Sequence, residues 1–383
     1  MDDTTGQLLE LIRSGQAVSR AQLTLQTGLA RATVASRLQL LLDSGLVIRD
    51  NLVRDTGGRP AERLVINPAR GYLLGADIGG SHTRIALLDL RGEVLATSDT
   101  VRDINDGPEI VLTEVCGGLE DLATNAHVPM TSVFGAAFGL PGPVEQIHGR
   151  ISGAPTMHGW DGFPVIDFVQ DRLGTPVAID KDSNIMALGE YHALESPDRD
   201  LIVLKVGMGV GAGIITDGRI FRGSHGAAGD LGHLPRRGGA PCRCGQEGCA
   251  EATAGGWSIA RRLREMGLSD VTTSQDIVRL ANARDPATSG LLRQAGNRLG
   301  EVLCDAIGIL NPSMVIVGGN LAVSDVLLAG IRERVYEDAH PLATMALRIE
   351  RGRLGDAAGL NGAGQLAAGV AFTGPRVQQL LST

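Results

Sequence analysis

Residues 72–88, YLLGADIGGSHTRIALL, read as an apolar strand, a tight glycine turn and a returning strand. A glycine turn at the end of a strand can present several backbone N–H groups to an anion. A second glycine-rich strand pair spans residues 201–216, and a third glycine turn at 318–319 follows the apolar run 314–317. Each turn alone is a weak signal, but three in this order predict an α/β body with two similar lobes around a cleft.

The composition agrees with such a body. The 383 residues are enough for two or three folded units, and 43% hydrophobic residues exclude a globally disordered chain. Aromatic residues make up only 3%, which argues against base stacking on single-stranded nucleic acid. The formal net charge of −8 argues against a protein that coats nucleic acid with its whole surface.

Two further observations concern the cellular compartment. No apolar run reaches the roughly 18 residues that a membrane span needs, and the start, Met1-Asp2-Asp3, lacks the features of a signal peptide. We therefore expect a cytoplasmic protein with no membrane partner. Cys116 and Cys304 lie in apolar, helical-looking surroundings and are expected to be ordinary buried cysteines.

The strongest chemical signal is the stretch GDLGHLPRRGGAPCRCGQEGCAE, residues 229–251. It contains one histidine and three cysteines that together make a closed tetrahedral zinc set: His233, Cys242, Cys244 and Cys249. Because such a set leaves no coordination position open, we expect a structural Zn²⁺ that holds a loop rather than activating water. Asp230 and Glu251 flank the ligands, so the ordered loop would fix two carboxylates suited to vicinal hydroxyl groups.

Asp182 is a candidate general base. It follows an expected strand at 176–179 and precedes an expected helix, which places its carboxylate where α/β folds bind ligands. The alternative is a surface aspartate that only caps the helix.

The first 60 residues form a separate unit by charge, since seven arginines against six Asp or Glu give +1 and leave −9 for the rest. An apolar stripe around Leu8 predicts a first helix that ends at Gly15. Ser19 as N-cap and a turn at Gly28 predict a second helix, and a third follows over residues 31–44. This is the pattern of helix, tight turn and helix.

Two short strands at 46–48 and 64–66 flank a turn-rich tip at 55–60, which completes a winged helix-turn-helix. The third helix would turn its polar face to the major groove of double-stranded operator DNA, and the tip could reach a minor groove. The residues expected to contact DNA are Arg31, Thr33, Ser36, Arg37 and Arg59. A small three-helix bundle used for protein contacts is the alternative.

These residues resemble the ROK family of repressors, open reading frames and kinases. The resemblance covers nearly the whole chain, and it rests on the turn at 77–80, the stretch 139–143, the segment 182–190, the zinc stretch and the glycines at 318–319 and 359–363. It implies a two-lobed, actin-like (ribonuclease H-like) sugar-kinase body. Members with an added N-terminal winged helix are transcriptional regulators, mostly repressors of sugar-use genes.

The resemblance also implies roles for individual residues. Asp182 corresponds to the catalytic base, here expected to be vestigial. The expected sugar-binding residues are Lys181, Asp182, Asp230, His233 and Glu251, with His233 binding zinc through one ring nitrogen and sugar through the other. The corresponding nucleotide-binding residues are Asp77, Gly79, Gly80, Gly209, Gly318 and Gly319.

Departures from the family pattern weaken ATP binding. Met208 stands where a Thr is usual, so a hydroxyl that would face a phosphate is replaced by a thioether. Lys181, one of only two lysines, stands where Asn is usual, and Asp230 replaces a Glu. Lys181 could attract an anionic ligand such as a sugar phosphate, or it could form an internal ion pair with Asp182.

The sequence therefore favours a sugar-responsive DNA-binding regulator that represses genes of carbohydrate use, with an active sugar kinase that carries an auxiliary DNA-binding head as the rival. Repression and activation are both compatible with these residues. A homodimer or tetramer is expected, because paired heads read paired half-sites. The expected boundaries are 1–70 for the winged helix and linker, 71–188 and 189–362 for the two lobes, and 363–383 for a helix returning to the first lobe.

Overall fold

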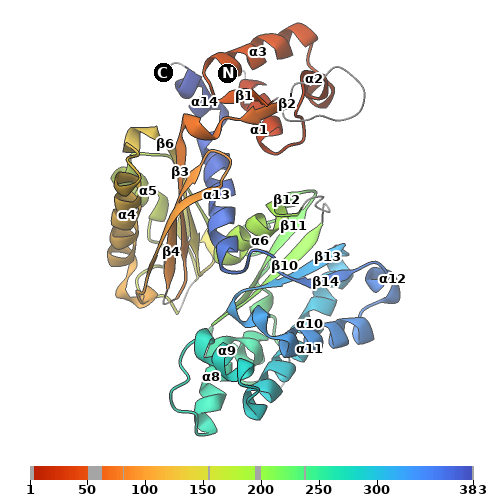
Figure 1. Ribbon diagram of the computed structural model, residues 1–383. Coiled ribbons are helices and arrows are strands. Elements are labelled where there is room, and N and C mark those ends of the chain that lie inside the picture. Colours follow the sequence, from red (N-terminus) through yellow and green to blue (C-terminus); the bar gives the residue numbers. More distant parts are fainter. Residues whose placement is uncertain are drawn as a thin grey trace.

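The computed structural model describes residues 4–50, 63–80, 82–153, 156–194, 200–236 and 239–381. A small N-terminal head sits on a body of two lobes, and the chain ends beside the head (Figure 1). No helix among the described residues is long and apolar enough to cross a membrane.

The head consists of three helices and a two-stranded antiparallel sheet. Its elements are α1 (Thr4–Arg13), α2 (Arg20–Thr27), α3 (Arg31–Asp43), β1 (Val47–Asp50) and β2 (Arg63–Ile66). Ser19 caps α2 by accepting a hydrogen bond from the Gln22 backbone N–H, and Gly28 ends α2 in the left-handed region with φ 66°. The expected order of helix, tight turn, helix and strand pair is thus present, while Arg59 and the tip at 55–60 lie outside the described residues.

The first lobe is built on a five-stranded sheet with the order β5-β4-β3-β6-β9. Its strands are β3 (Tyr72–Ile78), β4 (Thr83–Asp89), β5 (Val94–Thr100), β6 (Val133–Leu140) and β9 (Val177–Lys181). β3, β4 and β5 form an antiparallel meander, and β6 and β9 extend the sheet in parallel to β3. The helices α4 (Pro108–Asn125) and α5 (Val165–Leu173) and the short pair β7 (Val144–Glu145) and β8 (Arg150–Ile151) belong to the same lobe.

The second lobe repeats this plan. Its sheet has the order β12-β11-β10-β13-β14, again an antiparallel meander extended by two parallel strands. The strands are β10 (Leu201–Val206), β11 (Val210–Thr216), β12 (Arg219–Ile220), β13 (Met314–Gly318) and β14 (Arg348–Arg351). The helices are α7 (Glu251–Ala254), α8 (Gly256–Glu265), α9 (Ser274–Asn282), α10 (Pro286–Leu310), α11 (Asp325–Asp338) and α12 (Pro341–Thr344). Two lobes with the same topology confirm the expected actin-like body.

Two helices cross from one lobe to the other. α6 (Asp182–His192) follows the last strand of the first sheet but packs on β10 and β11 of the second. α13 (Ala358–Ala371) follows the last strand of the second sheet but packs on β3 and β6 of the first, and α14 (Gly374–Leu381) then reaches the head. The boundaries expected at 188/189 and 362/363 fall inside these helices, so we propose to divide the chain at the starts of α6 and α13 instead.

Candidate functional site

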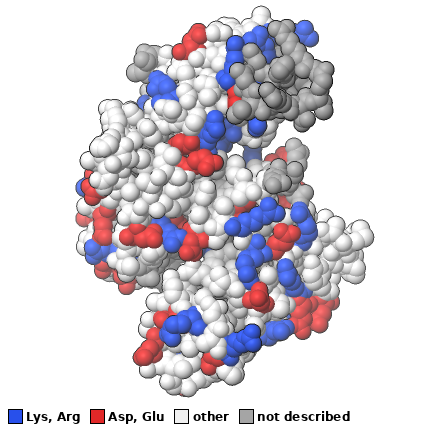
Figure 2. Space-filling model, viewed as in Figure 1, with Lys and Arg blue, Asp and Glu red and all other residues white. Residues whose placement is uncertain are grey.

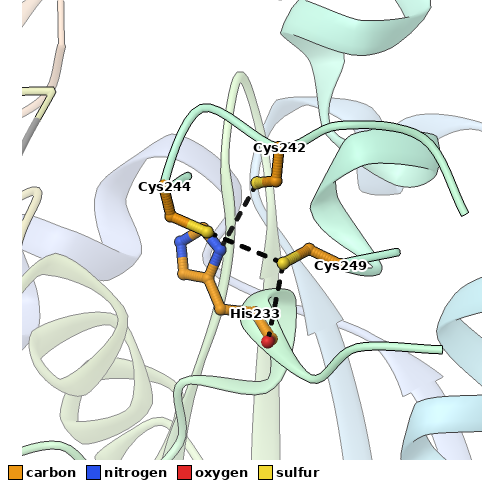
Figure 3. Close-up of side chains that lie close together, drawn as sticks. All are labelled: His233, Cys242, Cys244 and Cys249. Carbon is orange, nitrogen blue, oxygen red and sulfur yellow. Dashed lines mark hydrogen bonds between the residues drawn. The ribbon is translucent and has the colours of Figure 1, made fainter. Parts of the chain in front are cut away.

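The four predicted zinc ligands lie together (Figure 3). One ligand atom from each of His233, Cys242, Cys244 and Cys249 falls within 4.8 Å of all the others. Sγ of Cys242 lies 3.6 Å from Nδ1 of His233, and the Sγ atoms of Cys244 and Cys249 are 3.6 Å apart. Three thiols and one imidazole at this spacing are the donor set that tetrahedral Zn²⁺ takes, so the residues present fit this metal.

The loop around these ligands depends on glycine. Gly248 has φ 76°, and a Cβ atom there would lie only 1.8 Å from the backbone oxygen of Arg236. In return, the backbone N–H of Arg236 donates to the Gly248 oxygen at 2.9 Å. This close backbone contact brings Cys249 back beside the segment of His233, which explains how a short stretch can surround one ion.

Glu251 connects the zinc loop to the second glycine turn. Its Oε2 accepts a hydrogen bond from the backbone N–H of Val210 at 2.8 Å, and its Oε1 accepts one from Nε1 of Trp257 at 3.0 Å. The ring of Trp257 is in turn covered by the guanidinium of Arg243 at 4.4 Å from the ring centroid. The carboxylate of Glu251 is therefore hydrogen-bonded to a backbone N–H at the end of this turn. In a turn that binds phosphate, such N–H groups would donate to the phosphate oxygens.

Asp182 is the first residue of α6 and forms an ion pair with Lys205 of β10. Nζ of Lys205 lies 2.9 Å from Oδ2 of Asp182 and 4.0 Å from Oδ1 of Asp77. Burial disfavours the charged amine, but the two carboxylates together outweigh it and raise the pKa of Lys205 above its ordinary value. Lys205 is thus a fixed cation between two acidic side chains.

Asp77 ends close to α13. A Cβ atom on Gly359 would lie 2.0 Å from Oδ2 of Asp77, so only glycine fits at this position of α13. Burial raises the pKa of Asp77, and Lys205 opposes that effect. Within the described residues, Oδ1 of Asp77 has no hydrogen-bond partner, which leaves Lys205 as its nearest compensating charge.

Lys181 is not the partner of Asp182. Its side chain is 8% exposed, and its Nζ donates to the backbone oxygen of Ala228. Burial lowers the pKa of Lys181, against the opposing effects of Asp230, Asp182 and Asp180. The ion pair with Asp182, one of two interpretations of Lys181, is instead made by Lys205, because strand β10 places that side chain directly beside the start of α6.

A buried ion pair supports the same region. Asp180 is 1% exposed and lies next to Lys181 at the end of β9. Its Oδ2 accepts a hydrogen bond from Nε of Arg222 at 2.8 Å and forms an ion pair with Nη2 at 2.7 Å, and its Oδ1 accepts a hydrogen bond from Asn184. Arg222 stands in the loop that leads to Asp230, so this pair ties the second lobe to the end of the first sheet.

Sequence reasoning missed Lys205, Arg222 and Trp257. A signal for Lys205 was available, because the chain has only two lysines beside 33 arginines and both lie beside Asp182. The expected sugar-binding residues differ in exposure. Asp230 is exposed, whereas Glu251 is half-buried and hydrogen-bonded to the second glycine turn. Of the glycines expected at the nucleotide, Gly319 has φ 83° and Gly209 lies against Glu251.

The residues expected to read DNA lie on α3, away from this site. Arg31 and Ser36 are exposed, and Thr33 and Arg37 are half-buried, while Val34, Leu38 and Leu41 of the same helix are buried in the head. On the face of the molecule shown in Figure 2, basic and acidic side chains are interspersed over both lobes. The body on that face therefore offers no continuous basic surface of the kind that binds nucleic acid.

Comparison with known proteins gives a consistent result. A family model described as the ROK family matches residues 73–370. A glucokinase from Halalkalibacterium halodurans is 29% identical over 77% of this chain and 94% of its own length. A xylose repressor from Caldicellulosiruptor bescii is 29% identical over 92% of each chain, so its similarity extends into the head.

Two solved structures are similar in fold. A ROK family transcriptional regulator described as a homologue of the E. coli MLC protein superposes with a TM-score of 0.81 over 99% of this chain and 98% of its own, at 24% identity. A ROK family glucokinase from Streptomyces griseus, in complex with glucose and AMPPNP, has a TM-score of 0.68 and 27% identity over 78% of this chain and 99% of its own. With two lobes of the expected topology and a family model that covers most of its length, the chain belongs to the ROK family.

Proposed function

We propose that the protein is a sugar-responsive DNA-binding transcriptional regulator, and that it represses genes of carbohydrate use. The observation that carries this proposal is the pairing of Asp182, the residue that corresponds to the family's base, with Lys205 in a chain that also has a winged helix-turn-helix head. Among the relatives that share the head is the xylose repressor from Caldicellulosiruptor bescii, whose similarity covers 92% of this chain.

DNA binding is assigned to α3. It is the second helix of the helix-turn-helix, the element that enters the major groove in this motif. The exposed Arg31 and Ser36 lie in its N-terminal half, where side chains reach base edges and phosphates. We expect two heads of a homodimer or tetramer to bind half-sites roughly 34–36 Å apart or a multiple of this distance.

Sugar binding is assigned to the junction of the lobes. Asp182, Asp230, His233 and Glu251 supply the carboxylates and the imidazole that would hold sugar hydroxyl groups. His233 turns Nδ1 toward Cys242, which leaves Nε2 for a hydroxyl. A Zn²⁺ ion bound by His233 and the three cysteines would be structural, and its contribution is to fix the loop that joins Asp230 to Glu251. Three thiolate ligands suit the reducing cytoplasm.

Phosphoryl transfer is proposed to be slow or lost. A general base must reach the hydroxyl proton that it accepts, and Oδ2 of Asp182 is already paired with Nζ of Lys205 at 2.9 Å. At the second glycine turn, Met208 offers no hydroxyl, and the carboxylate of Glu251 already binds the Val210 N–H. An incoming phosphate would have to displace a like charge there.

The rival function is an active sugar kinase with an auxiliary head, favoured by the glucokinase of which the chain covers 94%. One experiment separates the two: ATP turnover by the purified, zinc-loaded protein with D-glucose, D-xylose and N-acetyl-D-glucosamine, beside gel shifts with the DNA upstream of its own gene. We expect no turnover and a sugar-dependent change in the gel shift. Robust turnover with DNA binding that no sugar alters would establish the rival. Thermal-shift screening across sugars and sugar phosphates identifies the effector.

A further inference from the structure

Helix α6 joins the proposed sugar site to the head. Asp182 is its first residue and His192 its last, and 11 helical residues span about 16 Å. α6 packs closely on the second lobe, because glycines in β11 let the helix approach the strand. A Cβ atom on Gly213 would lie 2.4 Å from Cβ of Ala187 and 2.5 Å from the backbone oxygen of Ser183. α6 is thus packed closely on the second sheet, and it also contacts α13 on the first lobe.

The head, by contrast, is fixed to the first lobe. Nη1 of Arg13 in α1 donates to Oε1 of Gln365 in α13 at 2.7 Å, and Nε of Arg91 in the turn between β4 and β5 donates to the backbone oxygen of Ile66 at 3.0 Å. The apolar core of the head continues into α13, α14 and the first sheet without interruption. Residues of this shared core include Leu8, Leu9, Leu41, Phe134, Phe372 and Leu380.

A cavity of about 570 Å³ separates the head from the last turn of α6. On the side of the head it is lined by Ile12 and Arg13 of α1 and by β2, and on the side of α6 by Gly189, His192 and Ala193. This cavity is partly open to solvent and is not filled by side chains, so it leaves room for one element to approach the other. The cavity therefore lies between the head and the end of the helix that begins at Asp182.

α6 and α13 pack against each other at the junction of the lobes. A Cβ atom on Gly362 would lie 1.6 Å from the backbone oxygen of Ile185, and one on Gly189 would lie 2.1 Å from that of Ala358. The helix backbones are thus in direct contact. Glu190 of α6 stabilises the same contact region. Its carboxylate accepts hydrogen bonds from the backbone N–H groups of Arg353 and Leu354 at 2.8 and 3.1 Å.

From this geometry we propose that α6 transmits the ligand state of the lobe junction to the DNA-binding head. When a sugar bound at Asp182 closes the lobes, the last turn of α6 moves into the cavity and presses on α1 and β2, which changes how the head presents α3. The inference rests on the proposed function, because a sugar can shift the head only if it binds the open and closed arrangements differently.

Filling the cavity tests this directly. Ala193→Trp places a large side chain in the space beside α1 without touching Asp182, and Ala193→Leu does so with less bulk should the larger residue prevent folding. Ala283→Trp, on the exposed end of α9, is the matched control. The readout is the ratio of dissociation constants for the gene's own upstream DNA with and without D-xylose, D-glucose or N-acetyl-D-glucosamine.

We expect the ratio to fall to nearly one in the Ala193 variants and to stay at the wild-type value in Ala283→Trp. Calorimetry should still detect binding of the sugar that is active on the wild type. A folded Ala193 variant that keeps the wild-type ratio overturns the role of α6 and leaves the proposed function intact. A wild-type protein that binds the DNA but responds neither to these sugars nor to any sugar or sugar phosphate found in the thermal-shift screen overturns both.

Discussion

Nζ of Lys205 lies 2.9 Å from Oδ2 of Asp182 and 4.0 Å from Oδ1 of Asp77, so one ammonium group joins two carboxylates. The three side chains come from β10, from the start of α6 and from β3, and they meet where the lobes join. A cation supplied by the chain itself thus stands between Asp182 and the strand that leads to the first glycine turn.

Removing this ammonium is expected to destabilise the fold. In Lys205→Met, Asp182 and Asp77 face each other without compensation, and we expect a loss of about 1–3 kcal/mol, less than for a fully buried pair because Lys205 keeps some exposure. Urea denaturation measures the change. In the double variant Lys205→Met/Asp182→Asn, the repulsion is absent, so much of the stability should return. A double variant no more stable than Lys205→Met would show that the pairing has little energetic weight.

Zinc is expected at one ion per chain. Cys244→Ser should abolish it in elemental analysis, because a closed four-ligand site loses most of its affinity with one thiolate. The thermal midpoint should fall by at least roughly 5 °C, as it should in wild-type protein treated with a chelator. Cys304→Ser, outside the cluster, is the control and should keep the ion. Equal zinc content in Cys244→Ser and wild type would refute the ligand assignment.

Operator binding is expected to depend on α3. Arg31→Ala and Arg37→Ala should each weaken binding by about 1–3 kcal/mol, seen in a gel-shift titration at fixed salt. Arg279→Ala, at an exposed position of α9 in the second lobe, removes the same charge far from the head and should have no effect. Unchanged affinity in the Arg31→Ala/Arg37→Ala double variant would mean that α3 is not the recognition helix.

Cys116 is expected to resist alkylation. It is fully buried, and burial raises the pKa of its thiol to about 12, so near pH 8 the thiol stays protonated. Mass spectrometry after iodoacetamide treatment of the zinc-loaded protein should find Cys304, which is half-buried, modified well before Cys116. Because the thiolate is the reactive form, any modification of Cys116 should accelerate as pH rises. Equal rates at both cysteines near pH 8 would contradict this account of Cys116.

Much of this protein could be predicted from short stretches of sequence. The zinc cluster, the caps at Ser19 and Gly28, and the three glycine turns were all found where they were expected. Each of these depends on residues close together in the chain, because a cap, a turn or a chelating loop is satisfied locally. The two-lobed plan followed from the order of such local signals.

The contacts that give the lobe junction its chemistry were decided by the tertiary structure. Lys205 rather than Lys181 pairs with Asp182, Glu251 binds the turn at Val210, and α6 and α13 each pack on the sheet of the other lobe. These contacts join residues far apart in the sequence. They depend on strand register and on how closely glycine lets two backbones approach, and neither quantity is encoded in any one stretch of the chain. The sequence by itself therefore determined which chemical groups the protein has, and only the packing of the lobes decided which of them meet.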